Sequence, residues 1–246
     1  MPFSGDIYTL SDIKKSTLNL IHEIKQRPIQ DESEHFVLLD QLNLALEQFF
    51  ELSERIESEP ELLKSTDIDF GSISELGDYG LQLLASLEQW VDTVKPEDTS
   101  RIQISTLSLA VWIHDHQGVL QQLENAVNAL SQLANQANES EALTKLHRSA
   151  EKITNSASEM IKADIDKSEP GRPWRILNLN HGIIATRTHD INIMNTVFEQ
   201  LIQRLPDDAA NFFADGMKQM DIIGYPDHVK HVMEQFYQLT NQPTLH

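Results

Sequence analysis

The stretch from Gly171 to Leu205 constrains the fold of this chain most, because its apolar residues recur at the spacing of an α-helix. At about 100° per residue, one helical face carries most of its large apolar residues: Leu177, Ile184, Ile191, Met194, Phe198 and Leu201. Asn180 and Arg187 fall within the same face. An isolated charge on a buried face is too costly to remain unpaired. The sequence therefore predicts one long helix with a structural arginine near its middle.

Helical periodicity also dominates the rest of the chain, and no segment alternates in the way a half-buried strand does. Further helices are expected over residues 10–26, from a capping box at Asp31 and Glu34, from a second capping box at Ser72 and Glu75, over 100–137, over 140–167, from Pro206 to Gly224, and from Pro226 onward. Residues 57–71 are expected to form a loop. The fold class that this pattern favours is all-α, with about eight helices in an antiparallel bundle, a long central hairpin and no β-sheet.

Length and charge suggest how the chain is organised. Residues 1–246 are expected to form a single all-helical domain, with two sub-bundles, 1–95 and 96–246, as a further possibility. The chain carries 38 acidic against 19 basic residues, a net charge of −19, and most of the excess lies in the first 100 residues. Such an acid excess repels phosphate backbones and anionic lipid surfaces, so neither nucleic acid nor a membrane is an expected partner.

Several chemical classes are excluded or disfavoured by residue usage. The absence of cysteine excludes disulfides, zinc–thiolate sites and thiol nucleophiles. The N-terminal residues MPFSGDIYTLSDIKK lack the apolar core of a signal peptide, and no uninterrupted apolar stretch approaches membrane-spanning length. A cytoplasmic location is therefore the expectation.

His114 and Asp115 end an apolar helical segment, and this pair resembles the paired ligand of the metal-dependent HD-type phosphohydrolases. The resemblance covers only a few residues and implies a metal site and phosphate-ester hydrolysis. The upstream histidine that these enzymes need is missing between His35 and His114, and so is their glycine-bearing continuation. We therefore expect neither a bound metal nor another cofactor, and we interpret His116 as a histidine at the edge of the core.

Two interpretations of the Gly171–Leu205 segment remain open. Its second side carries amide and imidazole groups, and a candidate pocket for an anionic ligand would be built from His116, Asn180, His181, Arg187 and His189. In the structural interpretation, the guanidinium of Arg187 is held by Asp190, by Asp115 or by carbonyl oxygens.

No complete catalytic constellation is present in the sequence. The leading hypothesis is therefore a non-catalytic helical protein that acts by contact with a protein partner or with a second copy of itself. The alternative is a small-molecule-binding protein or hydrolase. A ligand-binding protein should have a concave pocket lined by Arg187 and Asn180, whereas an interaction protein should have an apolar groove or patch over a packed interior.

Overall fold

The computed structural model describes residues 3–27, 32–59, 73–165 and 167–241. The described residues form eleven α-helices and one short 3₁₀ turn, at Pro96–Asp98. The helices are α1 (Leu10–Lys25), α2 (Glu32–Ser58), α3 (Ile73–Val94), α4 (Thr99–Asp115), α5 (Glu124–Gln136), α6 (Ser140–Ser156), α7 (Glu159–Lys162), α8 (Pro173–Thr188), α9 (Ile191–Arg204), α10 (Pro206–Ile223) and α11 (Asp227–Thr240). The predicted all-α class is confirmed, and these residues contain no strand, only an isolated bridge between Leu120 and Ala157.

Several helix ends lie where the local chemistry predicts them. Thr9 caps α1 in a capping box with Asp12. Pro206 begins α10, where its missing N–H costs nothing, and Gly224 ends that helix in the left-handed conformation with φ 77°. Pro226 immediately precedes α11 rather than opening it. The predicted capping residues Asp31 and Ser72 lie outside the described residues.

The prediction of about eight helices is too low because three predicted helices are each interrupted. The expected helix over 100–137 ends at Asp115, where Gln117 takes φ 62°, and resumes at Glu124. The interruption is fixed by tertiary contact, since the Leu120 amide donates to the Ser156 carbonyl at 2.7 Å. The expected helix over 140–167 likewise ends at Ser156, and Ser158 caps the short α7.

The long helix predicted over Gly171–Leu205 is also wrong in its continuity. His189 adopts φ 60° and ends α8, and the Asp190 carboxylate then accepts the Asn192 and Ile193 amides to begin α9. No glycine or proline signals this break in the sequence. His189 was not expected to end the helix, because a non-glycine residue rarely takes positive φ.

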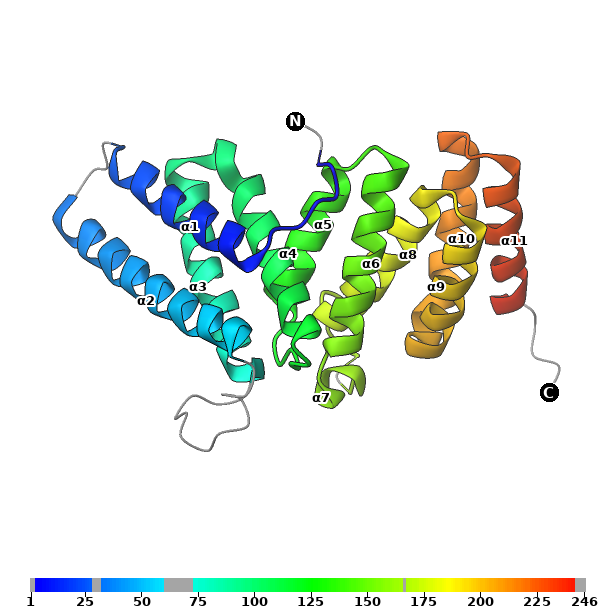
Figure 1. The fold of residues 1–246 in the computed structure, drawn as a ribbon. Coiled ribbons are helices and arrows are strands. Elements are labelled where there is room, and N and C mark those ends of the chain that lie inside the picture. Colours follow the sequence, from blue (N-terminus) through cyan, green and yellow to red (C-terminus); the bar gives the residue numbers. More distant parts are fainter. Residues whose placement is uncertain (1–2, 28–31, 60–72, 166, 242–246) are drawn as a thin grey trace.

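The helices form an elongated row, with α1 and α2 at one end and α10 and α11 at the other (Figure 1). Packing continues along the row through α3 on α4, α6 on α8 and α8 on α9. The N-terminal segment before α1 lies across the middle, where the Phe3 amide donates to the Gln136 carbonyl and the Tyr8 amide to Ser108 Oγ at 2.8 Å. A continuous cluster of buried apolar residues runs from α1 to α11, across the junction between residues 95 and 96. No helix within the described ranges has the length and apolar character needed to span a bilayer.

Candidate functional site: a groove between α8 and α10

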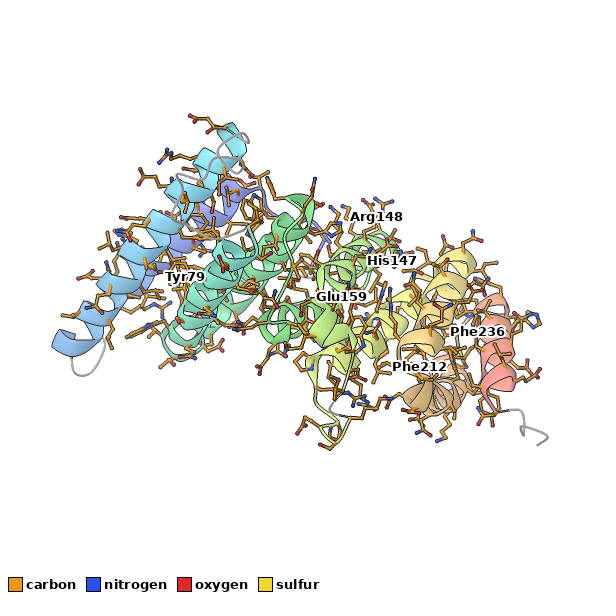
Figure 2. The ribbon with its side chains drawn as sticks, turned by 90° about the horizontal axis from the view of Figure 1, so that it is seen from below. Tyr79, His147, Arg148, Glu159, Phe212 and Phe236 are labelled. Carbon is orange, nitrogen blue, oxygen red and sulfur yellow. The ribbon has the colours of Figure 1, made fainter. Side chains whose placement is uncertain are left out.

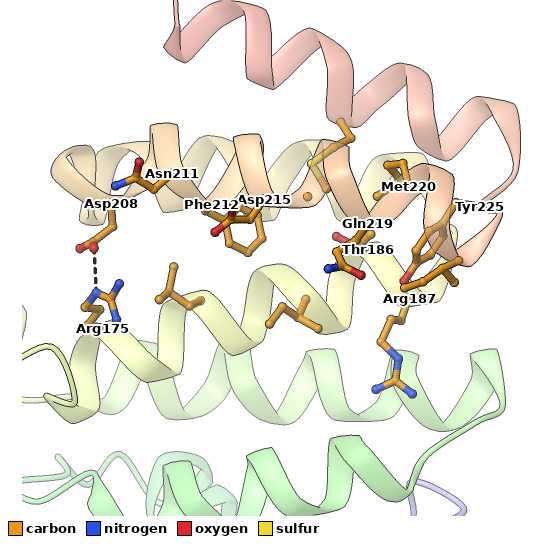
Figure 3. Close-up of a pocket in the computed structure, with 15 residues that line it drawn as sticks. Arg175, Thr186, Arg187, Asp208, Asn211, Phe212, Asp215, Gln219, Met220 and Tyr225 are labelled. Carbon is orange, nitrogen blue, oxygen red and sulfur yellow. Dashed lines mark hydrogen bonds and ion pairs between the residues drawn. The ribbon is translucent and has the colours of Figure 1, made fainter.

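A groove of about 540 Å³ runs between α8 and α10, and we call it the α8/α10 groove (Figure 3). Its lining residues come mainly from these two helices: Arg175, Leu179, Ile183, Thr186, Arg187, Asp208, Asn211, Phe212, Asp215, Gly216, Gln219, Met220, Ile223, Tyr225 and Met233. Apolar and polar residues are equally numerous in this lining, but most of the surface that they expose to the groove is apolar, as is usual for a site that takes up apolar groups.

The groove exists because α8 and α10 each pack mainly against other helices. α8 packs on α6 and α9, while α10 packs on α11 and α9. Between them, the Phe212 ring lies against Gly182, where an added Cβ would be only 2.6 Å from the Phe212 Cζ atom. Phe212 itself is held edge-on by Phe198 and Phe213 at centroid distances of 5.9 and 5.2 Å. This aromatic cluster also includes Phe236 on α11 and lies toward the C-terminal end of the molecule (Figure 2). It holds Phe212 in place at the floor of the groove.

Two aliphatic side chains on the walls are open to solvent. Ile183 on α8 is 48% exposed and Ile223 at the end of α10 is 60% exposed. Scattered exposed aliphatic residues are normal on protein surfaces, but these two line the same concavity. On the α10 side, the exposed residues Asn211, Asp215 and Gln219 form a polar rim at helical spacing.

One end of the groove is closed by an ion-pair network. Arg175 Nε donates to Asp208 Oδ1 at 2.7 Å (Figure 3), and Arg172 binds Asp164 through both Nε and Nη2. A longer contact of 3.5 Å links Arg172 to Asp208. The positive charges at this end are therefore matched by carboxylates.

Arg187 lies at the other end, and carbonyl oxygens hold it. Its Nη1 and Nη2 donate to the carbonyls of Ala134 and Ala137 at 2.7 and 2.5 Å. These carbonyls end α5, which has no basic residue in its own last turn, so Arg187 caps α5 from α8 (Figure 3). Neither carboxylate suggested by the sequence is its partner, since Asp190 caps α9 and Asp115 pairs with Lys152 at 2.7 Å.

A smaller concavity of about 260 Å³ adjoins this end of the groove, and we call it the end pocket. It shares Arg187, Ile223 and Tyr225 with the groove. The other lining residues come from the α5–α6 connection, from α6, from the α8–α9 junction and from the α10–α11 connection: Asn138, Leu143, His189, Gly224 and Pro226. The His189 and Tyr225 rings meet edge-on at 5.4 Å.

The structure does not bring the five candidate pocket residues of the sequence together. Arg187 lines both concavities and His189 lines the end pocket. His116 ends α4, where its Nδ1 lies 2.9 Å from the Trp112 carbonyl. Asn180 donates to Ser131 Oγ at 2.5 Å. The second side of α8, for which the sequence indicated amide and imidazole groups, is also buried, and His181 is only 1% exposed.

The buried His181 instead forms a pair with the half-buried His147 of α6, away from the groove. Its Nε2 lies 2.8 Å from His147 Nδ1, and the two rings stack at 5.0 Å. Burial, with smaller effects of His147 and Arg204, lowers the pKa of His181 from 6.5 to about 3. Burial also lowers the pKa of His147. This pair is a neutral hydrogen-bonded element between α6 and α8.

The histidine and aspartate behind the HD-type resemblance have structural contacts. His114 Nδ1 lies 2.8 Å from Ser156 Oγ, and Asp115 is occupied by Lys152. Within the described parts of the chain, no three His, Cys, Asp or Glu side chains come close enough to hold a metal ion. These contacts link α4 to α6 and provide no third ligand.

Sequence reasoning missed the α10 wall, because Phe212 and Gly216 look like ordinary core positions until α8 is placed opposite them. The available signal in the sequence was the pair of isoleucines ahead of Gly224, Ile222 and Ile223. Both are exposed in the structure. Comparisons with family models, with curated proteins and with solved structures each found no match.

Proposed function

We propose that this chain is a non-catalytic helical protein that binds a partner protein by receiving a row of apolar side chains in the α8/α10 groove. The observation that carries the proposal is the groove itself, an open channel with a mainly apolar surface and two solvent-exposed isoleucines, Ile183 and Ile223. Helix-in-groove recognition places the apolar face of a partner helix into such a channel.

The size of the groove favours one face of a helix over a whole helix. Its α10 wall runs from Asp208 to Ile223, which at 1.5 Å per residue is about 22 Å long. A helix of that length and about 10 Å across would occupy about 1,700 Å³, which is more than the groove can hold. The groove therefore fits a row of side chains spaced at i, i+3 or i+4, and i+7, while the partner backbone stays outside.

The chemistry of the walls supports binding over catalysis. Arg175 is paired with Asp208, and Asp215 is paired with Lys218 at 2.9 Å on the surface. His181, whose pKa is strongly shifted, is buried elsewhere. A general acid or base must reach a reacting group in the site. The groove residues do not include an exposed acid and base placed to act together.

The second candidate function is binding of a small apolar molecule. Its supporting observation is the volume of about 540 Å³, which falls within the usual range for ligand pockets, about 300–1,000 Å³. Among the exposed groups on the rim, Asn211 and Gln219 would then supply hydrogen bonds to that ligand.

A display selection with the full chain tests the proposal. A library of helical peptides of about 16 residues would be selected against the protein and then re-tested on two variants. Ile183→Glu places a carboxylate in the groove, and Leu44→Glu makes the same change at a comparably exposed position on α2. We expect apolar residues at helical spacing to be enriched, and binding to be lost in Ile183→Glu but retained in Leu44→Glu. Selection of no peptide, or equal binding to both variants, would contradict the proposal.

A further inference from the structure

The two ends of the α8/α10 groove differ in charge. At the start of α8, Arg172 and Arg175 are both matched by carboxylates. At the other end, Arg187 has no carboxylate partner among the ion pairs of the described residues, and its contacts are the two α5 carbonyls. The C-terminal end of a helix carries about half a negative charge. The positive charge of the Arg187 guanidinium is therefore only partly compensated by the end of α5.

The lining of the end pocket contains no acidic residue, although acidic residues outnumber basic ones two to one in this protein. Its polar groups are the Asn138 amide, the Arg187 guanidinium, the His189 imidazole and the Tyr225 hydroxyl. Three acidic residues adjoin lining residues in sequence: Glu139, Asp190 and Asp227. Asp190 is engaged by the backbone amides of α9, and Glu139 and Asp227 are exposed and lie outside the lining. The pocket is therefore a cationic, donor-rich concavity on an acidic molecule.

Arg187 retains hydrogen-bonding capacity for a ligand. A guanidinium has five N–H donors, and its contacts with Ala134 and Ala137 use one donor on each terminal nitrogen. Tyr225 is half-buried beside it; burial raises the pKa of Tyr225 and the positive charge of Arg187 opposes that rise. Both side chains line the groove as well as the end pocket, so they stand where the two concavities adjoin.

We propose that the end pocket binds the carboxylate of an aspartate or glutamate at one end of the docked partner segment. This inference rests on the proposed function and adds an orientation to it: the apolar row lies in the groove and the acidic residue lies at Arg187. Ile183 and Arg187 are one helical turn apart on α8, about 6 Å along the axis. The acidic residue should therefore lie within one or two turns of the apolar residue at that end of the segment.

The test uses peptides selected by the display experiment, measured against the unmodified full chain. Each peptide is compared with a version in which its terminal acidic residue is changed to the amide, Glu→Gln or Asp→Asn. A second version carries the same change at an acidic position facing solvent. Because charge-assisted hydrogen bonds are about twice as strong as neutral ones, we expect the first change to weaken binding about tenfold or more. The solvent-facing change should alter binding less than about twofold.

Protein variants complete the comparison. In Arg187→Gln the ratio of acid to amide affinity should fall to about one, and in Tyr225→Phe the preference for the acid should be reduced. Equal binding of acid and amide peptides to the unmodified protein would overturn the inference and leave groove docking intact. Saturable binding of acetate or phosphate alone at Arg187, with no contribution from the peptide, would show a free-anion site and also overturn it. Failure to select any peptide would remove the proposed function and this inference together.

Discussion

Protonation of His181 should make the fold sensitive to mild acid. The side chain is 1% exposed, its Nε2 shares a hydrogen bond with His147 Nδ1, and burial lowers its pKa to about 3. A single proton serves the contact between the two rings, so charging the ring that accepts it would place two N–H groups opposite each other. The charged groups around the pair are Arg148, Glu151, Asp190 and Arg204.

The sign and size of the effect follow from linkage. The unfolded His181 gains a proton below a pH of about 6.5, whereas the folded side chain stays neutral until pH falls to about 3. Between these values the unfolded state binds more protons, so stability falls as pH falls, at up to about 1.4 kcal/mol per pH unit. At pH 5 the loss relative to neutral pH is about 2 kcal/mol. Because burial lowers the pKa of His147 as well, its contribution has the same sign.

Urea denaturation at neutral pH and at about pH 5 would measure this loss. His181→Gln removes the titrating group, so the variant should lose about 2 kcal/mol less than the unmodified protein over that interval. The same comparison with His231→Gln, an exposed histidine on α11, controls for a generic change in histidine content. Equal losses for the unmodified protein and His181→Gln would refute the argument, because acid sensitivity would then come from other groups.

Three stability predictions rest on other contacts and can be measured by the same denaturation assay. A Cβ at Gly77 would lie 2.4 Å from Ile113 Cγ1 between α3 and α4, so Gly77→Ala should cost about 1–3 kcal/mol and be partly rescued by Ile113→Val. Arg187→Met removes two charge-assisted bonds to the end of α5 and should cost about 1.5–3 kcal/mol; a change below about 0.5 kcal/mol would mean that the cap is not needed. Asp190→Ala removes the α9 N-cap and should cost about 1 kcal/mol, whereas Asp190→Asn should cost little.

The fold class was predictable because helix formation and burial leave a local pattern. The spacing of Leu177, Ile184 and Met194 correctly marked fully buried positions, whereas Ile191, predicted on the same face, begins α9 and is 44% exposed. Proline and glycine punctuation at Pro206 and Gly224 located both ends of α10. These features depend only on neighbours within a few turns, so a single sequence is enough to find them.

The breaks inside the long helices were not predictable in the same way. His189 takes a left-handed conformation without being glycine, and the break near Leu120 depends on a backbone hydrogen bond to Ser156, far along the chain. In hindsight, Asp190 carried a local signal, because aspartate is among the best N-cap residues. Its negative charge next to Arg187 instead suggested an ion pair.

The candidate site was predictable only in part, for a related reason. Arg187 was identified because a charge on an apolar face needs an explanation, and it does line the groove. His181 and Asn180 share its helix but face α6 and α5, where His147 and Ser131 satisfy them. The opposite wall belongs to α10, and no local pattern in one helix shows which other helix lies across a gap from it.

Methyl NMR of the isoleucine-labelled full chain, titrated with a selected peptide, tests the account most directly. Ile183 and Ile223 line the groove, whereas Ile7 and Ile165 are exposed elsewhere on the surface. Docking in the α8/α10 groove predicts saturable shifts of the Ile183 and Ile223 methyl signals, with the Ile7 and Ile165 signals unchanged. Saturable shifts at Ile7 or Ile165, with Ile183 and Ile223 unchanged, would contradict it.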